Sequence, residues 1–349
     1  MLPIENLSRP PSWWAQPAPG REVLFSTRVR LARNLAGVPF LLRADAAVRA
    51  EVVERLRRAL AGNELTRSFA YADFEKLEAN ERLILLERNL ASRDLVEGEG
   101  PRGLFLSPGE GASVMVNEED HVRIQSLKPG LSLEWAWEEA DAIDDLLEEE
   151  TPFAFREDLG YLTACPSNLG TGLRASVLMH LPGLVITRRM EKVFRAVTEA
   201  GFAVRGMHGE GSEPVGHFFQ VSNQRTLGKP EARILADLAE LARQIEDYEK
   251  KARQHLLEKD ALRFADRIHR AWGILTSARM MSSTEAIMLL SALRMGSVCG
   301  LIEKAEPDRV DHLLTVVQPA HLQYIGGREM DDQERDHFRA DFIARHLLS

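Results

Sequence analysis

Residues 165–182 read CPSNLGTGLRASVLMHLP, and the rest of the chain is organised around this stretch. It places a thiol at Cys165, glycines at 170 and 172, and a guanidinium at Arg174. Glycine adopts positive φ without steric cost, so a phosphate can approach the main chain there, and arginine stays charged at any working pH. The combination suits an anionic ligand, although an ordinary glycine-rich turn has the same composition.

Length and composition limit the possible classes of protein. With 349 residues, 44% of them hydrophobic and 28% charged, the chain is expected to form two domains, or one large domain with an appendage. No apolar run approaches the ~20 residues of a membrane span and no signal-peptide pattern opens the chain, so we expect a cytoplasmic protein. Two cysteines are too few for a disulfide framework or a cysteine-based zinc site. A net charge of −9 argues against binding to nucleic acid.

The common nucleotide-binding loops are absent from the sequence. No G-x-x-x-x-G-K-[ST] motif occurs. Glycines 98, 100 and 103 match G-x-G-x-x-G, but no strand leads into them and no helix follows. The pattern predicts instead a hairpin, with strands at 103–107 and 113–116 around a turn at 108–111.

Two charged clusters precede the glycine-rich stretch. A predicted strand at 23–25 leads into Ser26-Thr27-Arg28-Val29-Arg30, where Arg28 and Arg30 point to the same face. Such like charges repel, which indicates either an anion between them or simple solvation. Residues 117–123, NEEDHVR, offer carboxylates beside a histidine and an arginine. That run is typical of a solvated turn, and as a site it would bind a cation or accept a proton.

These clusters together resemble a known family. STRVR at 26–30, NEEDHVR at 117–123, CPSNLGTGLR at 165–174 and RGMHGEGSE at 205–213 are similar to the motifs of the phosphagen (guanidino) kinases, in the same order. The resemblance covers about residues 20–230. The family's N-terminal helical domain has no counterpart here, and more than a hundred residues follow the last motif. This layout resembles the bacterial protein-arginine kinases of that family.

The resemblance implies a fold and a set of site residues. It implies an α+β fold, in which a guanidino-kinase catalytic domain with an antiparallel sheet flanked by helices precedes an all-helical C-terminal domain. It implies that ATP, with Mg²⁺, is held through its phosphates by Arg28, Arg30, Arg123, Arg174 and Arg205. Glu119 and Glu210 match the carboxylates that hold the substrate guanidinium, and Cys165 matches a thiol beside it. No residue is assigned to a metal.

One position departs from the family pattern. The histidine that stacks on adenine is matched here by Leu178, and His180 lies two positions later. We therefore assign adenine contact to neither residue. Contact with the phosphates has the stronger support.

The domain boundaries follow from changes in pattern. We expect an irregular leader at 1–20, with Trp13 and Trp14 as anchors, a catalytic domain at 21–228 and a helical domain at 229–349. Apolar residues from Ile234 to Tyr248 recur at the spacing of a packed helix seam, used within the chain or in a homodimer. Further predictions are a helix from Ala286 that Gly296 ends and a loop at 318–321.

The last helix carries a second motif. Arg335-Asp336-His337-Phe338-Arg339-Ala340 matches the R-D-x-x-R-A element of protein-arginine kinases. Arg335 and Arg339 lie one turn apart and would clamp a phosphate, and Asp336 would bind a guanidinium, so the motif would form an allosteric site for phosphoarginine. Ion pairing along the helix surface is the alternative.

The expected function is ATP-dependent phosphorylation of arginine side chains in proteins. The resemblance further implies a zinc-containing activator protein, a Clp-type unfoldase that degrades the marked proteins, a stress-gene repressor as a target, and a homodimer. Two alternatives stay open. One is a kinase for a small guanidino compound, and the other is a non-catalytic adaptor that binds phosphoarginine.

Overall fold

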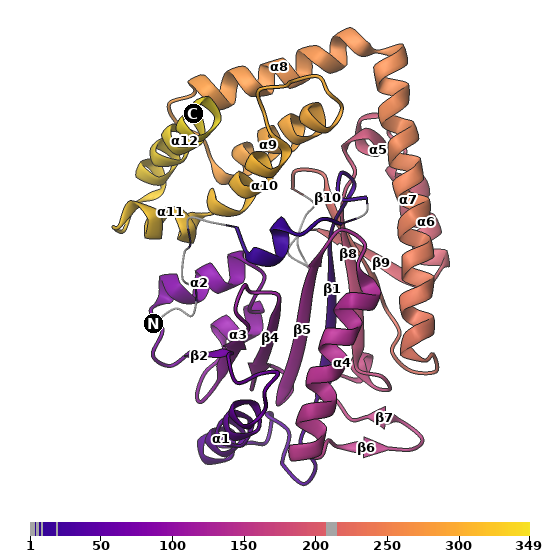
Figure 1. Cartoon of the computed structure of the whole chain (residues 1–349), viewed down its shortest axis with the longest axis vertical. Coiled ribbons are helices and arrows are strands. Elements are labelled where there is room, and N and C mark those ends of the chain that lie inside the picture. The colour runs from indigo at the N-terminus through magenta and orange to yellow at the C-terminus, as the bar shows by residue number, and fades with distance from the viewer. Residues whose placement is uncertain (1–3, 5–6, 8–9, 19, 207–214) are drawn as a thin grey trace.

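The computed structural model describes residues 4, 7, 10–18, 20–206 and 215–349. A sheet with its flanking helices forms one part of the molecule, and a group of helices forms the other (Figure 1). The predicted α+β fold class, an antiparallel sheet followed by a helical region, is confirmed.

A single antiparallel sheet organises the catalytic part. Its eight strands, among the described residues, lie in the order β2-β3-β4-β5-β1-β8-β10-β9. Their bounds are β1 Leu24–Arg33, β2 Ala70–Asp73, β3 Gly103–Leu106, β4 Ala112–Val116, β5 Val122–Pro129, β8 Leu173–His180, β9 Phe202–Gly206 and β10 Phe218–Asn223. A separate small hairpin pairs β6 Phe155–Arg156 with β7 Gly160–Tyr161.

Two predictions for the strands have different outcomes. The hairpin of β3 and β4 is confirmed, with Gly109 at φ 82° in its turn. The strand predicted at 23–25 is much longer, because β1 continues to Arg33 with a partner on each side, β5 and β8. Alternating apolar residues such as Val29 and Leu31 give one face of β1 to the core. The other face is thereby left for Arg28 and Arg30.

Helices cover the two faces of the sheet unequally. On the face of Val29 lie α1 Ala46–Gly62, α4 Leu133–Glu150, α6 Met190–Glu199 and α7 Glu231–Lys259, with the short α5 Pro182–Ile186 beside α7. On the opposite face, α2 Ala79–Glu87 and α3 Arg93–Glu97 pack in a cluster with residues of β2, β3 and β4 and with Leu127 of β5. The arginine-bearing half of that face is therefore not covered by these two helices.

The leader is anchored as predicted. A short 3-10 helix, η1 Ser12–Ala15, buries Trp13 against the α2 and α3 side of the sheet. The ring of Trp14 meets Phe25 of β1 edge-on, with centroids 4.9 Å apart.

The long helix α7 joins the two parts of the molecule (Figure 1). The predicted apolar stripe packs within the chain, because Ile234, Leu238, Leu241 and Ile245 are all buried in the core beneath the sheet. Tyr248 is the exception, since it is 54% exposed. The boundary at 228/229 stays a prediction, and α7 shares the core of the part that precedes it.

The remaining helices form the C-terminal group. They are α8 Ala261–Ser277, α9 Ser283–Val298, α10 Pro307–Val316, α11 Pro319–Gly326 and α12 Asp332–Leu348. Two predictions are wrong here. Gly296 does not end α9, because the helix continues to Val298. The glycine instead lets α8 and α9 approach each other, since a Cβ at that position would lie 2.1 Å from Cγ2 of Ile268. The predicted loop at 318–321 is the start of α11, with Pro319 as its first residue.

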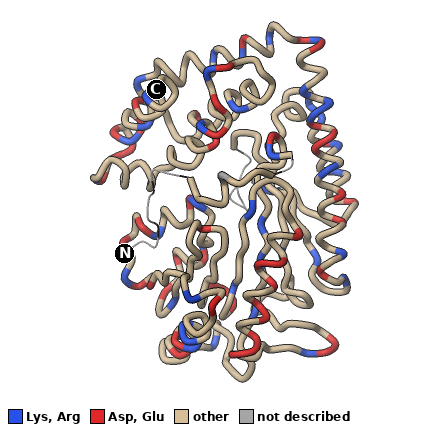
Figure 2. The backbone as a smooth tube through the Cα atoms, in the orientation of Figure 1, with Lys and Arg blue, Asp and Glu red and all other residues tan. Residues whose placement is uncertain are grey.

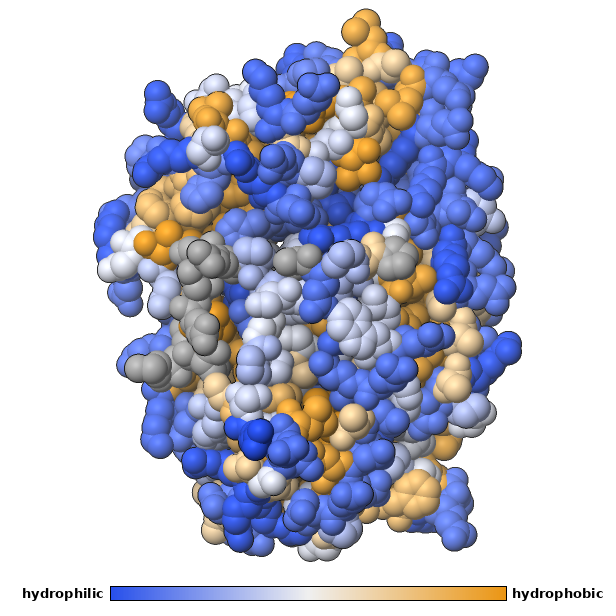
Figure 3. Space-filling model, viewed as in Figure 1, coloured by the Kyte–Doolittle hydropathy of each residue, from blue (hydrophilic) through white to orange (hydrophobic). Residues whose placement is uncertain are grey.

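The surface is unevenly charged and mostly hydrophilic. Acidic residues gather along α4, whereas basic residues occur on the central strands (Figure 2). Hydrophobic side chains on the visible face form separate patches over the helical part and over the catalytic part (Figure 3). Within the described ranges, no helix combines the length and apolar character needed to cross a membrane.

Candidate active site

The register of the central strands brings predicted phosphate-binding arginines together. Arg30 of β1 lies directly opposite Arg174 of β8, and Arg28 lies opposite Ser176. Residues directly opposite each other share a face, and so do residues two apart on one strand. Arg28, Arg30 and Arg174 therefore extend from the same face of the sheet.

The other two arginines join the same face from neighbouring strands. Arg123 of β5 lies opposite Ala32, two residues beyond Arg30. Arg205 of β9 lies opposite Gln220, and the Gln220 side chain accepts a hydrogen bond from Arg28 at 3.0 Å. The face thus carries all five cations that the sequence indicated.

This concentration of charge has an electrostatic cost. Burial lowers the pKa of Arg28 to about 10. Burial also lowers the pKa of Arg30 well below its usual value, and the charges of Arg28 and Arg123 lower it further. The Nε atom of Arg30 is buried and has no hydrogen-bond partner within the part of the chain that the structure describes. A polyanion that neutralises the cluster would relieve both the repulsion and this unmet donor.

An acidic loop closes one end of the arginine face. Arg123 bonds to Glu118 at 2.7 Å, forms a shorter ion pair with Glu119 and lies 3.4 Å from Asp120. Burial alone would lower the pKa of Arg123, but the three carboxylates outweigh burial and raise it. Arg123 is therefore fixed in place and fully charged.

Adjacent glutamates in that loop have different surroundings. The Glu118 side chain is fully buried and accepts a hydrogen bond from Ser92 at 2.5 Å, so it serves to orient Arg123. The Glu119 side chain is 39% exposed. Burial raises the pKa of Glu119 even though Arg123 opposes the shift. A carboxylate with a raised pKa at the open end of a cation cluster is suited to bind a guanidinium and accept its proton.

Asp120 connects the acidic loop to the stretch that opens at Cys165. One of its oxygens accepts hydrogen bonds from Asn34 Nδ2 and from the backbone N–H of Ala164, both at 2.7 Å. Cys165 is thereby held next to the loop, partly exposed, with its Sγ 3.0 Å from Ser167 Oγ. No local sequence signal indicates this role for Asp120.

His121 takes no part in the site. Its Nδ1 accepts from the backbone N–H of Leu35 at 3.1 Å, and its Nε2 lies 3.0 Å from the carbonyl oxygen of Pro39. Burial lowers the pKa of His121, so the ring is neutral and structural. No group of three or more potential metal ligands occurs among the described residues.

Glu210, the second predicted carboxylate, lies outside the described residues. Its role in binding the guanidinium stays a prediction. Arg205 precedes that segment and is placed by β9.

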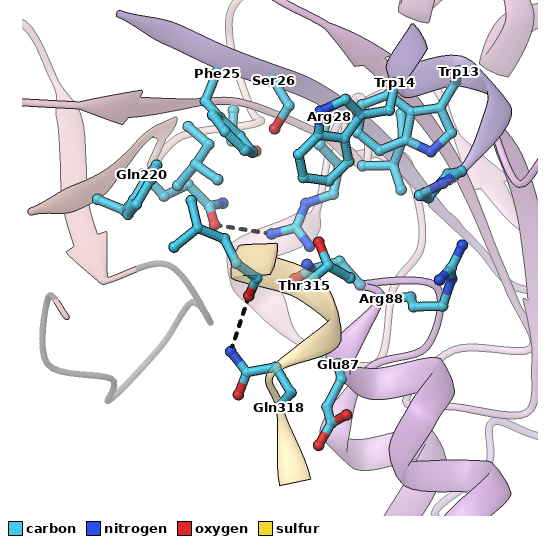
Figure 4. A pocket seen from close by; sticks show the side chains of 17 residues that line it. Trp13, Trp14, Phe25, Ser26, Arg28, Glu87, Arg88, Gln220, Thr315 and Gln318 are labelled. Atoms are coloured by element: carbon cyan, nitrogen blue, oxygen red, sulfur yellow. Dashed lines mark hydrogen bonds between the residues drawn. The ribbon is translucent and has the colours of Figure 1, made fainter. Parts of the chain in front are cut away.

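A cavity adjoins the arginine face at the end away from the acidic loop (Figure 4). Arg28, Ser176, Leu178 and Gln220 line it from the sheet. Leu178 therefore has an apolar surface available to a ligand. His180 is buried elsewhere, with Nε2 2.8 Å from Ser291 Oγ and Nδ1 3.0 Å from a nitrogen of Arg294.

The residues of the R-D-x-x-R-A motif are engaged within the chain. Arg339 is buried and donates to the carbonyl oxygens of Val317 at 2.9 Å and Met281 at 2.7 Å, and it pairs with Asp336 at 2.5 Å. Arg335 pairs with Asp332 and is more exposed. The predicted phosphate clamp would thus require Arg339 to exchange these contacts.

Comparisons with known proteins agree with this geometry. A family model for the ATP:guanido phosphotransferase C-terminal catalytic domain matches residues 51–252. A crystal structure of lombricine kinase superimposes with a TM-score of 0.60 and 25% identity, covering 72% of this chain and 71% of that one. Fold and site thus define a guanidino phosphotransferase.

Relatives that match the chain over its full length show to which kind of guanidino phosphotransferase it is similar. A model for the protein-arginine kinase McsB C-terminal domain matches residues 261–349. Protein-arginine kinases of Moorella thermoacetica and Symbiobacterium thermophilum are 43% and 42% identical, covering 99% and 98% of both chains. The chain belongs to the protein-arginine kinase family, as the sequence motifs indicated.

Proposed function

We propose that this protein transfers the γ-phosphoryl group of ATP to arginine side chains of other proteins. The observation that carries the proposal is the convergence of five arginines on one sheet face, with the partly exposed Glu119 beside Arg123 at its end. Phosphoryl transfer needs fixed positive charge around a triphosphate, and this face supplies it in advance.

The proposed reaction assigns a task to each end of the site. The arginine guanidinium of the substrate has no free lone pair on nitrogen, since it stays protonated at any working pH. Glu119 orients it and accepts a proton as the nitrogen–phosphorus bond forms. The bond between the γ-phosphorus and its bridging oxygen breaks at the same time, and ADP leaves with that electron pair. The arginines stabilise the charge on the transferring group.

Cys165 and Mg²⁺ have supporting roles in the proposal. Held next to the acidic loop by Asp120, Cys165 assists electrostatically and forms no covalent intermediate. Mg²⁺ would neutralise phosphate charge, and it commonly binds through substrate phosphates with one or two protein carboxylates.

The two alternatives have less support. The C-terminal match to protein-arginine kinases favours a protein substrate over a small guanidino compound. A non-catalytic adaptor would have no physical reason to keep five repelling arginines beside Glu119.

The regulatory part of the proposal rests on the family resemblance. Phosphoarginine would bind at Arg335 and Asp336, with Arg339 nearby, and would favour one arrangement of the domains. The proposal further includes a homodimer in the cytoplasm. Its partners would be a zinc-containing activator, a Clp-type unfoldase and a stress-gene repressor as target.

The chemical stability of the product tests the proposal. The purified protein is incubated with MgATP and a basic acceptor protein. We expect protein-bound phosphate that is lost in mild acid and survives alkali, because an N–P bond breaks once its nitrogen is protonated. Acid-stable phosphate as the sole product would contradict it.

A further inference from the structure

The cavity beside Arg28 has a wall that comes from the C-terminal helices. Trp13 and Trp14 line it from the leader, and Leu314, Thr315 and Gln318 line it from the end of α10 and the start of α11. In Figure 4 the labelled Thr315 and Gln318 lie across the cavity from Phe25 and Ser26 of β1. Segments far apart in the chain thus build one enclosure.

The position of this cavity relates it to the phosphate cluster. Arg28 belongs both to the cavity and to the arginine face, and it lies two residues from Arg30 on β1, about 7 Å along the strand. Glu119 marks the opposite end of the face, where phosphate would be transferred. A triphosphate lying along the arginines therefore directs its nucleoside into the cavity.

The lining of the cavity suits a nucleoside. Trp14, Phe25, Leu178 and Phe218 offer apolar and aromatic surface for a base. Thr315 offers a hydroxyl group and Gln318 an amide. The Gln318 side chain makes no capping bond for α11, and it donates to the carbonyl oxygen of Leu314 only at 3.5 Å, the outer limit of a hydrogen bond. Its amide is thus available to a ligand.

A carboxylate of the catalytic part holds this wall in place. Glu87, at the end of α2, accepts hydrogen bonds from the backbone N–H groups of Ala320 at 2.8 Å and His321 at 3.0 Å. It also contacts Nδ1 of His321 at 2.7 Å. These contacts satisfy the free N–H groups of the first turn of α11 and fix its start against α2.

A second anchor acts from the other side of the wall. Arg339 donates to the carbonyl oxygen of Val317, the residue that directly follows α10. The junction that carries Thr315 and Gln318 is therefore held from α2 by Glu87 and from α12 by Arg339.

We propose that the C-terminal helices complete the nucleotide site, with Thr315 and Gln318 contacting the nucleoside of ATP and Glu87 positioning them. The inference rests on the proposed use of ATP, and it adds a specific task for the helical part within the catalytic step. Nucleotide affinity would then depend on contacts between the two parts of the chain.

The test compares a ligand that has a nucleoside with one that lacks it. Calorimetry measures binding of Mg-ADP and of Mg-tripolyphosphate to the full chain and to T315V, Q318L and E87Q. We expect each variant to bind Mg-ADP about 3- to 10-fold more weakly, the effect of one lost hydrogen bond, and to bind tripolyphosphate like the wild type.

A matched variant controls for stability of the helical part. Ser282 caps α9 by accepting from the N–H of Glu285 at 3.2 Å, and it does not line the cavity. S282A removes a helix cap in the same part of the chain and should leave binding of both ligands unchanged. Thermal unfolding of each variant without ligand separates loss of fold from loss of contact.

Two outcomes would overturn the inference. One is unchanged Mg-ADP binding in the folded T315V and Q318L variants, and the other is an equal loss of Mg-ADP and tripolyphosphate binding. No acceptor protein is present in these measurements. The inference can therefore fail while arginine phosphorylation stands, and arginine phosphorylation can fail while the inference stands.

Discussion

Arg30 and Arg174 face each other directly across the β1–β8 pair, with Arg28 and Arg123 close by on the same face. Like charges directly opposite in a sheet destabilise it, so this arrangement costs stability in the free protein. The lowered pKa of Arg30 has the same physical origin. The cost is offset when a polyanion binds, which links stability to the ligand.

Replacing Arg30 should therefore stabilise the free protein. R30M removes a buried charge that its neighbours repel, and we expect the free energy of unfolding to rise by about 1 kcal/mol. MgATP at a hundred times its Kd should raise the free energy of unfolding of the wild type by roughly 3 kcal/mol. The same MgATP concentration should stabilise R30M far less. Thermal unfolding with and without MgATP measures both, with R43M as an exposed control. A free R30M less stable than the wild type would argue against stored repulsion.

Replacing the two adjacent glutamates of the acidic loop should have different effects, one on phosphoryl transfer and the other on stability. E119Q should abolish phosphoryl transfer and leave Mg-ADP binding within about twofold, because Glu119 acts on the acceptor. E118Q should lower the free energy of unfolding by about 1–3 kcal/mol, because the buried Arg123 loses its closest orienting partner besides Glu119. Transfer assays and denaturant unfolding of both variants make the comparison. Full transfer by E119Q would remove this carboxylate from the mechanism.

The pH dependence of the wild type should report Glu119. Its pKa is raised by burial, and the reaction needs the ionised form, so kcat/KM should fall as the pH decreases through this raised value. The acidic limb should lie above the ordinary glutamate pKa. A pH–rate profile with saturating MgATP tests this, and a limb at or below the ordinary value would contradict the assignment.

Two helical glycines should respond oppositely to alanine. Gly296 in α9 faces Ile268, and a Cβ there would lie 2.1 Å from that side chain, whereas Gly273 in α8 has nothing within 4 Å. G296A should lower the free energy of unfolding by about 1–3 kcal/mol through overpacking. G273A should raise it by about 0.5–1 kcal/mol, since alanine favours the helix. Urea unfolding of the two variants measures both changes. A shift of the free energy of unfolding in the same direction in both variants would contradict the prediction.

The site was predictable where strand geometry decides it. A two-residue spacing places Arg28 and Arg30 on one face without further knowledge, and the family motifs add the other three arginines. The family motif indicates Glu119, but the role of Glu118 was not predictable, because it shows only in its burial beside Ser92 and Arg123. Thr315 and Gln318 carry no local signal, because their position depends on how α11 docks on Glu87. Gly296 gives a helix-end signal in sequence and meets a packing requirement in space.

The identity of the phosphorylated side chain tests the central claim most directly. An acceptor protein and a version with all its arginines replaced by lysine are incubated with the wild type and MgATP, and the modified residues are located by mass spectrometry under alkaline conditions. We predict phosphate on arginine in the first acceptor and none in the second. Equal phosphorylation of both acceptors, or phosphate on serine and threonine only, would contradict the account.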